Sequence, residues 1–222
     1  MYSKLSKIEE EKLRSIQKSI AKKIILKDEF SRPIKTIAGF DLAFSDEKAF
    51  VAGIVMDYET LHVTEIEIIK TKISFPYVTT FLTFREGPPI MKLYNKLKSK
   101  PDIIMINGQG IAHPLRCGIA SHVGVSIDIP SIGIAQSNLC GEYKEPKNFD
   151  QYNWVVYNNK KVGYVYKSKE NCKPIFISPG HKVSLRTSLK IVISCVRNYK
   201  LPVPLRMAHF YANEMKKKYA KG

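Results

Sequence analysis

Four polar residues of this 222-residue chain are of types that could take part in hydrolytic or metal-ion chemistry: Asp41, Glu86, Asn107 and His209. Asp41 is the most informative, because it is the only charged residue in the apolar segment 37–44. A carboxylate costs free energy to bury unless it is paired, hydrogen-bonded or bound to a metal ion. Two interpretations of Asp41 stay open: a metal ligand, or a buried carboxylate that accepts backbone N–H groups or faces an arginine.

The other three residues each fit both a chemical role and an ordinary structural role. Glu86 precedes Ile90 by four residues and could extend the inward face of a helix, but an acid near a helix N-terminus is also favoured by the helix dipole. Asn107 ends an apolar segment, where α/β sheets place ligands, yet Asn-Gly is also a common turn. His209 lies on the apolar face of a C-terminal helix, where a histidine is commonly a core residue.

An aromatic segment at 75–81 could contact bases. Tyr77 and Phe81 could insert between bases or stack on one, or they could attach this loop to the hydrophobic core. The chain has no Walker A loop, no GxSxG motif and no HExxH motif, and no two histidines have the spacing of a metal site. The sequence therefore gives no support to the hydrolase classes that these motifs define.

The charge balance points to a polyanionic partner. Lys and Arg number 36 against 20 Asp and Glu, a net charge of +16, which favours nucleic acid first and an anionic membrane second, with a role in solubility as the alternative. No apolar run is long enough to span a bilayer, no signal-peptide pattern opens the chain, and the four cysteines lack zinc-site spacing. We expect a cytoplasmic protein with one domain over residues 1–222 and no membrane partner.

Hydrophobic periodicity predicts helices near both ends of the chain and strands between them. Strands at 35–44, 49–56 and 61–74 are joined by short gaps and should form an antiparallel meander. A Pro- and aromatic-rich loop at 75–89 leads into a helix at about 88–99, since Pro88 suits a first helical turn. The other expected elements are a helix at 6–26, strands at 102–107 and 131–136, two or three strands within 152–178, and helices at 117–127, 184–198 and 204–219. This order matches the α/β, ribonuclease-H-like arrangement of a mixed β-sheet flanked by helices. By itself the pattern supports only an α/β or α+β protein with a mixed sheet.

Six segments together resemble the endonuclease V family, nucleases that cut nucleic acid near deaminated adenine. The resemblance covers residues from about 37 to 210 in the family's order, and the FREGP and GIAHP…GIASH blocks are specific to it. The matching segments are IAGFDLAF (37–44), FPYVTTFLTFREGPPI (75–90), PDIIMINGQGIAHPLRCGIASHVGV (101–125), IPSIGIAQSNLCG (129–141), SPGHKVSL (178–185) and LPVPLRMAH (201–209).

The resemblance implies a ribonuclease-H-like fold and a metal-dependent endonuclease that uses Mg²⁺ or Mn²⁺. It implies that Asp41 and the residue at position 107 are metal ligands, that Glu86 completes the acidic cluster, and that His209 belongs to the same active site. The implied reaction is hydrolysis of the second phosphodiester on the 3′ side of a deaminated base in DNA, with RNA as the alternative. Family members are usually monomers.

The resemblance also implies a wedge that holds the duplex open and a pocket for the flipped base. The wedge corresponds to Pro76, Tyr77, Val78 and Thr79, and the pocket region to Gly110, Ile111, His113 and the nearby Gln136.

The chain departs from the family pattern at several of these positions. Asn107 replaces the second catalytic Asp, so its amide oxygen can bind Mg²⁺ but brings no charge. Many members have Lys where this chain has Gln136, and Thr79 and Thr80 replace a Pro and a Gly of the wedge. Three alternatives to an active endonuclease follow. The chain could be a silent or weakened member that binds lesion-containing or single-stranded nucleic acid, or an enzyme whose Asp was mutated to trap a complex. It could also be a nuclease of altered specificity, with a rearranged site that uses other ligands such as Glu86, Asp128 or His209.

Overall fold

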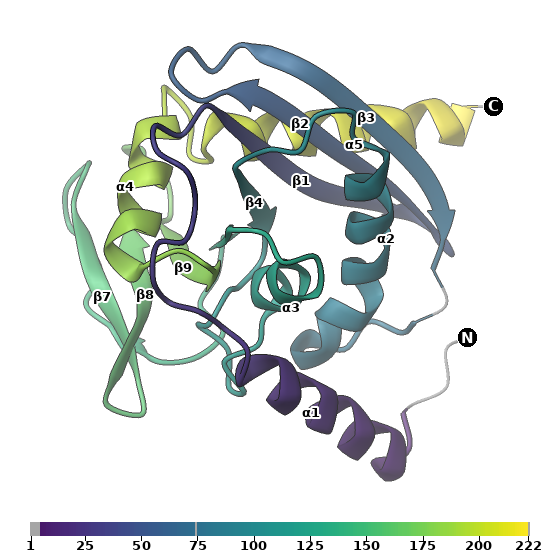
Figure 1. Ribbon diagram of the computed structural model, residues 1–222, viewed down its shortest axis with the longest axis horizontal. Coiled ribbons are helices and arrows are strands. Elements are labelled where there is room, and N and C mark those ends of the chain that lie inside the picture. The colour runs from purple at the N-terminus through teal and green to yellow at the C-terminus, as the bar shows by residue number, and fades with distance from the viewer. Residues whose placement is uncertain (1–4, 74, 222) are drawn as a thin grey trace.

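A computed structural model describes residues 5–73 and 75–221, and its strands form one nine-stranded sheet (Figure 1). The strand order is β3-β2-β1-β4-β5-β9-β8-β7-β6. The predicted meander is present as β1 (Thr36–Ser45), β2 (Lys48–Asp57) and β3 (Val63–Lys72), which pair antiparallel. Residue 74, the predicted last residue of the third strand, lies outside the described residues.

The central strands bring two of the candidate residues together. β4 (Ile103–Asn107) pairs parallel with β1, and β5 (Ser131–Ala135) pairs parallel with β4. Both strands are apolar and buried, as expected for parallel strands with helices on both faces. Phe40 pairs with Ile106, so Asp41 and Asn107 are the next residues on neighbouring strands, close to the edge where the parallel strands end.

An antiparallel extension completes the sheet. β9 (Ile175–His181) pairs with β5, and β8 (Lys160–Tyr166), β7 (Tyr152–Tyr157) and β6 (Glu142–Tyr143) follow outward in that order. The sequence predicted two or three strands within 152–178. The structure has three there, the last of which continues to His181, and adds the two-residue β6.

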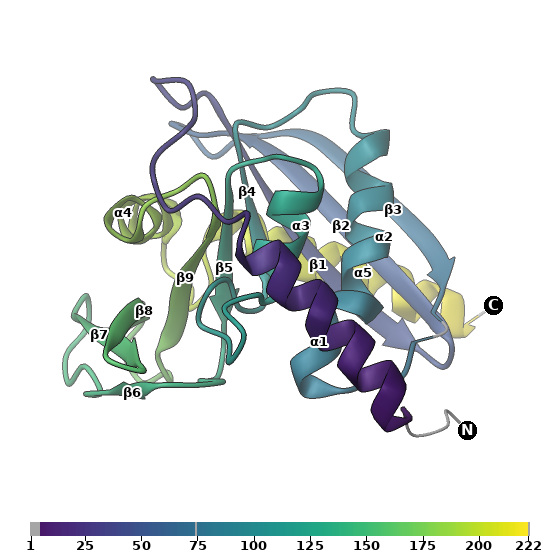
Figure 2. The same cartoon turned by 60° about the horizontal axis from the view of Figure 1, so that its bottom comes forward.

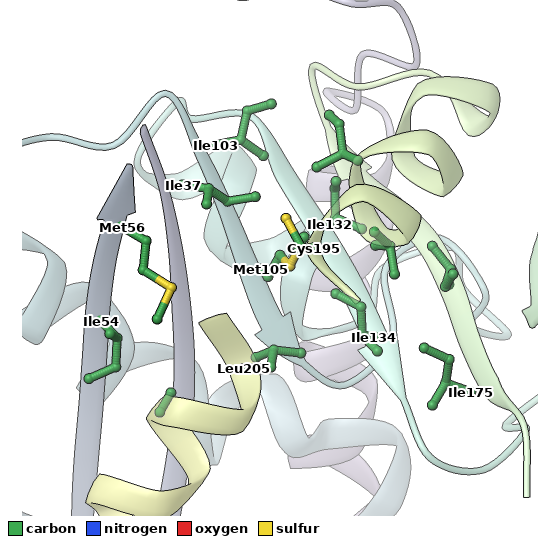
Figure 3. Close-up of a cluster of buried hydrophobic side chains, with 14 of the residues drawn as sticks. Ile37, Ile54, Met56, Ile103, Met105, Ile132, Ile134, Ile175, Cys195 and Leu205 are labelled. Carbon is green, nitrogen blue, oxygen red and sulfur yellow. The ribbon is translucent and has the colours of Figure 1, made fainter. Parts of the chain in front are cut away.

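Helices cover both faces of the sheet (Figures 1 and 2). α2 (Leu82–Lys96) and α3 (Ile119–Ser126) pack on one face, and α1 (Lys7–Ala21) contacts α3 on that side. α4 (Leu185–Cys195) and α5 (Val203–Lys221) pack on the opposite face, where Figure 3 shows Cys195 and Leu205 against strand residues such as Met105. This layered arrangement confirms the predicted ribonuclease-H-like architecture.

α2 begins at Leu82, six residues before the predicted start at 88. The prediction took Pro88 as a first-turn residue, but Phe81, Thr83 and Arg85 are already buried and extend the packed face upstream. Pro88 and Pro89 consequently lie inside the helix, and Glu86 is a helical residue rather than part of a loop.

α1 ends at Ala21 rather than at 26. Ile24 and Leu26 pack against an apolar cluster formed by β5, β7, β8 and β9, which a continued helix would not reach. The backbone N–H of Ile25 donates to Nδ1 of the buried His181, which fixes the chain where it leaves the helix.

Gly39 allows α5 to approach β1 closely. A Cβ atom built on Gly39 would lie 2.2 Å from the carbonyl oxygen of Pro204, a backbone contact that cannot be relieved by a side-chain rotation. We expect Gly39→Ala to lower the free energy of unfolding by about 3 kcal/mol. Gly87→Ala is the matched control, because its Cβ would meet only ordinary contacts at 3.6 Å or more within a helix. Urea unfolding of both variants checks this, and equal stabilities would contradict the close packing of α5.

Candidate active site

Asp41 is the centre of the candidate site. It is 4% exposed, and its Oδ1 accepts hydrogen bonds from the backbone N–H of Leu42 at 2.8 Å and from Nδ2 of Asn107 at 3.0 Å. Its Oδ2 lies 2.8 Å from Nδ1 of His209 on α5. β1, β4 and α5 thus bring together three of the four residues that the sequence singled out.

The hydrogen bonds fix the orientation of both partners of Asp41. A carboxylate only accepts, so the amide of Asn107 must turn its NH₂ group to Asp41, which leaves its Oδ1 available as a ligand. By the same argument, the Nδ1–H of His209 donates to Asp41, so Nε2 is the basic nitrogen of the neutral ring. Nδ2 of Asn213 lies 3.3 Å from this Nε2. The hydrogen bond to Asp41 raises the pKa of His209, whose side chain is about half exposed at 54%.

Glu86 lies on α2 and lines a pocket together with Asn107. Burial and, to a smaller extent, the negative charge of Asp41 together raise the pKa of Glu86 to about 7, while the positive charge of Arg85 acts in the opposite direction. Two carboxylates therefore lie close enough to repel each other in the absence of a cation. A bound divalent cation would offset this repulsion between the two carboxylates.

The donor set fits Mg²⁺ or Mn²⁺. Two carboxylates and one amide oxygen are hard oxygen ligands, and Mg²⁺ is commonly held by one or two carboxylates plus substrate phosphate. Within residues 5–73 and 75–221, no group of three or more His, Cys, Asp and Glu side chains is placed to hold a metal ion. A metal site here consequently depends on the amide oxygen of Asn107 or on the substrate for its remaining ligands.

Asp128 does not belong to this site. It precedes β5, whereas Asn107 ends the parallel strand β4, so the two residues lie at opposite edges of the sheet. Asp128 pairs with Nζ of Lys182 at 2.7 Å and lies 3.3 Å from Nε2 of His181. The hypothesis of a rearranged site that includes Asp128 is therefore wrong.

A pocket of about 310 Å³ adjoins Glu86 and Asn107, at the lower end of the range for ligand sites. Of the predicted wedge and pocket residues, Tyr77, Thr79, His113 and Gln136 line it. Tyr77 is 67% exposed beside the pocket, in a position where it can meet a partner. Pro76 and Val78 are not among the lining residues.

Gly110 and Ile111 lie behind this pocket rather than on its surface. Ile111 is fully buried in the apolar cluster next to β5 and β8, and Gly110 is packed against the backbone of Pro179. The pocket instead uses residues that the sequence did not single out: Gln17, Thr83, Gln109, Cys117 and Ser137.

Two polar residues of the pocket have defined states. Burial lowers the pKa of His113 to about 4, so its imidazole is neutral at pH 7. Its Nδ1 accepts from the N–H of Leu115 at 3.1 Å, so its Nε2–H faces the carbonyl oxygen of Thr80 at 3.1 Å. Gln136 accepts a hydrogen bond from Nζ of Lys200 at 3.3 Å, which brings an ammonium group next to this pocket residue.

The profile described as endonuclease V matches residues 18–210, which is most of the chain. The chain belongs to the endonuclease V family. It is 44% identical over 200 residues to endonuclease V of Dictyoglomus thermophilum, covering 90% of this chain and 87% of that protein. Endonuclease V of Thermosipho melanesiensis is 39% identical over 226 residues, with 98% and 97% coverage. The family is one of inosine-specific DNA repair endonucleases.

Solved endonuclease V structures have the same fold. The Bacillus subtilis protein superposes with a TM-score of 0.91 at 29% identity, covering 98% of this chain and 95% of that chain. The Ciona intestinalis protein, in complex with a 24mer DNA containing an inosine followed by a ribo-adenosine, gives a TM-score of 0.85 at 28% identity over 96% and 100% of the two chains. Across the described part of this endonuclease V family member, no helix has the length and apolar character needed to cross a bilayer.

The raised pKa of Glu86 predicts that divalent-metal affinity of this endonuclease V family member depends on pH. A metal ion binds the deprotonated carboxylate, so below pH 7 it must displace a proton from Glu86. We expect the Mn²⁺ affinity to fall by up to about tenfold per pH unit below 7 and to level off above it. Isothermal titration calorimetry between pH 5.5 and 8.5 measures this. In the Glu86→Gln variant, the Mn²⁺ affinity should keep only the shallower pH dependence that is due to His209. The same pH dependence in this variant as in the wild type would contradict the assignment of Glu86 as a metal ligand.

Proposed function

We propose that this chain is an inosine-directed endonuclease that uses Mg²⁺ or Mn²⁺ to hydrolyse the second phosphodiester on the 3′ side of a deaminated base in DNA. One observation carries the proposal: the buried Asp41 is hydrogen-bonded to His209 and to Asn107, and Asn107 lines a pocket together with Glu86. Family membership supplies the reaction class, and the arrangement of these residues beside a pocket supports the same chemistry.

Asp41, Glu86 and the Oδ1 of Asn107 would hold the metal ion. When bound, the cation supplies stabilisation of the negative charge that develops on the phosphorus oxygens and on the leaving 3′ oxygen. Asp41 also orients His209 through Nδ1, so Nε2 is the atom that can accept a proton from the attacking water.

The pocket would bind the deaminated base, and the exposed Tyr77 would contact the neighbouring bases. An inosine pairs less strongly than the normal bases, so moving it out of the stack costs less free energy and helps to select it. Tyr77 can fill or stack against the space that an extruded base leaves, as aromatic side chains do in single-strand binding. Of the other sequence-predicted residues of this region, Gly110 and Ile111 are packed behind the pocket, and Pro76 and Val78 belong to the loop that carries Tyr77.

A weakened or silent member that still binds the lesion is the second candidate function. Asn107 favours it, because the amide donates to Asp41 where an aspartate would instead add a negative charge to the metal site. We infer that Asn107 stands where the family has an aspartate and Gln136 where many members have a lysine. Lys200 partly compensates for the second change by bringing its ammonium group to Gln136.

Both candidate functions predict selective binding of inosine. We expect this protein, in metal-free buffer, to bind an oligonucleotide with one deoxyinosine at least about tenfold tighter than the same strand with deoxyadenosine. Fluorescence anisotropy with single-stranded DNA, duplex DNA and RNA measures this and identifies the preferred strand. The affinity should fall steeply with salt because of the +16 net charge. Equal affinity for the inosine and adenine strands would contradict the proposal.

A further inference from the structure

The exposed face of β7 is apolar and aromatic. Tyr152, Trp154 and Val156 are alternate residues of this strand, so their side chains lie on one face of the sheet. Their exposed fractions are 50%, 36% and 37%. An antiparallel strand with one solvated face normally carries polar residues there. Three successive apolar positions on such a face therefore indicate a surface that a partner covers.

A buried tyrosine of β8 holds the two exposed rings. Trp154 and Tyr164 are cross-strand partners, and their rings stack with centroids 4.1 Å apart and planes inclined by 30°. Tyr152 meets the same Tyr164 ring edge-on, with centroids 5.6 Å apart. Tyr164 itself packs in the apolar cluster that includes Leu189 of α4. Because the exposed rings are already held in place, they lose little conformational freedom when a flat ligand stacks on them.

Two cationic side chains accompany these rings. A β-bulge beside Val156 makes Lys161 its cross-strand partner, which brings the lysine to the same face. Nζ of Lys161 lies 4.1 Å from the ring centroid of Trp154, and it lies over the indole face that Tyr164 leaves free. Burial raises the pKa of the Tyr164 hydroxyl, and the positive charge of Arg186 acts in the opposite direction, so this guanidinium is also close.

The face is well separated from Asp41. β7 lies five strand positions from β1, which is about 24 Å at the usual strand spacing, and Figure 1 shows it at the end of the sheet away from β3. Asp150, which precedes β7, accepts a hydrogen bond from the hydroxyl of Tyr166 at 2.7 Å. Its carboxylate therefore lies at the opposite end of β8 from Lys161 and leaves the cationic end of the face free.

Exposed aromatic rings with cations beside them are the elements that bind single-stranded nucleic acid, because bases stack on the rings and cations pair with phosphates. We propose that Tyr152, Trp154 and Lys161, here called the β7–β8 platform, form a second DNA-binding site that takes a single strand. A phosphate of the strand draws the ammonium of Lys161 away from the indole, and a base takes its place on the ring.

The net charge of +16 favours this acidic ligand over the apolar face of a second protein. DNA is the polymer on which the endonuclease V family acts. Stacking on an aromatic ring accepts every base, so the platform requires no deaminated base. The inference therefore goes beyond the proposed function, and it holds whether or not the chain cleaves at inosine.

The intrinsic fluorescence of the protein tests the platform directly. Trp154 is the only tryptophan of the chain, so the tryptophan emission reports on this face alone. Full-length wild type in metal-free buffer is titrated with an oligothymidylate of about eight nucleotides, and with an abasic strand of the same length and charge. We expect the oligothymidylate to quench the emission about twofold or more at saturation, and the abasic strand to leave it unchanged.

Variants of Tyr152 separate stacking from a general change in the protein. Anisotropy of a labelled oligothymidylate should show at least about fivefold weaker binding by Tyr152→Ala and less than about twofold weaker binding by Tyr152→Phe, which keeps the ring. Tyr219→Ala is the matched control, because Tyr219 is also 36% exposed and lies near a lysine, but packs on Phe50 of β2. Its affinity for the oligothymidylate should equal that of the wild type.

A pair of lysine variants tests the contact with phosphate. Lys161→Gln should make the dependence of log Kd on log salt concentration shallower by about 0.7, the loss of one phosphate contact with a single strand. Lys48→Gln is the control, because the ammonium of Lys48 also lies over a tyrosine ring, that of Tyr219. The salt dependence of this control should remain that of the wild type.

The inference is overturned if the oligothymidylate does not bind, or if it binds without a change in the emission of Trp154. Equal quenching by the abasic strand, equal weakening in Tyr152→Ala and Tyr219→Ala, or tighter binding of oligouridylate or polyglutamate would overturn it as well. Thermal unfolding shows whether each variant is folded. None of these strands contains inosine, so failure here leaves the proposed function standing, and a chain that ignores inosine leaves the platform standing.

Discussion

Replacing Asn107 by Asp is expected to increase Mg²⁺-dependent cleavage of inosine-containing DNA by about 10- to 100-fold. The substitution is isosteric and adds one negative charge beside Asp41 and Glu86, where the metal ion would bind. It also removes the amide N–H that now donates to Oδ1 of Asp41, so that this oxygen becomes available to coordinate a cation. The gain should be largest at low Mg²⁺ concentration, because the added charge strengthens metal binding first.

Single-turnover cleavage over a range of Mg²⁺ concentrations measures this effect. Asn158→Asp is the matched control, since it makes the same change of charge in the exposed turn between β7 and β8. A folded Asn107→Asp protein with no gain in rate and no gain in metal affinity would show that position 107 does not contribute a metal ligand.

Asp41→Asn is expected to lower the cleavage rate by at least about 1000-fold. Asp41 supplies the most buried carboxylate of the site and the hydrogen bond that orients His209. The variant keeps the shape of the side chain but loses the charge that attracts the cation and stabilises a protonated imidazole. Binding of inosine-containing DNA without metal should change by less than about threefold, because the pocket is intact.

Cleavage and metal-free binding measured on the same preparation separate these two effects. Asp46→Asn is the control, because Asp46 is exposed in the turn between β1 and β2 at a positive φ that Asn also accepts. Cleavage by Asp41→Asn within tenfold of the wild-type rate would contradict the central role of Asp41.

The sequence predicts the central sheet well, and it singles out Asp41, Asn107 and His209, which the structure brings together, because both results depend on local patterns. Alternating apolar residues specify β1 to β3, and an isolated Asp41 in an apolar strand marks a polar site. The pairing of β1 with β4 then brings Asp41 to Asn107 without any information beyond strand order. Asp128, by contrast, was a candidate by residue type alone, and the strand direction places it at the other edge.

The pocket could not be predicted from the sequence because its walls come from distant segments. Gln17 meets Thr80 and Cys117 only through the packing of α1 on α3, and no periodicity identifies one glutamine of an amphipathic helix as buried. The start of α2 was misplaced because Pro88 normally marks a first turn, whereas here the packed face upstream of it outweighs that signal. That residues 1–222 act as one domain stays a prediction.

The most direct test is to incubate an excess of the wild-type protein with DNA that contains one deoxyinosine, in Mg²⁺ or Mn²⁺, and to identify the products by mass spectrometry. The account predicts a metal-dependent cut at the second phosphodiester 3′ of the inosine, with 3′-hydroxyl and 5′-phosphate ends, and no cut in the matched adenine strand. No cleavage by either the wild type or Asn107→Asp, or cleavage that does not depend on the inosine, would contradict it.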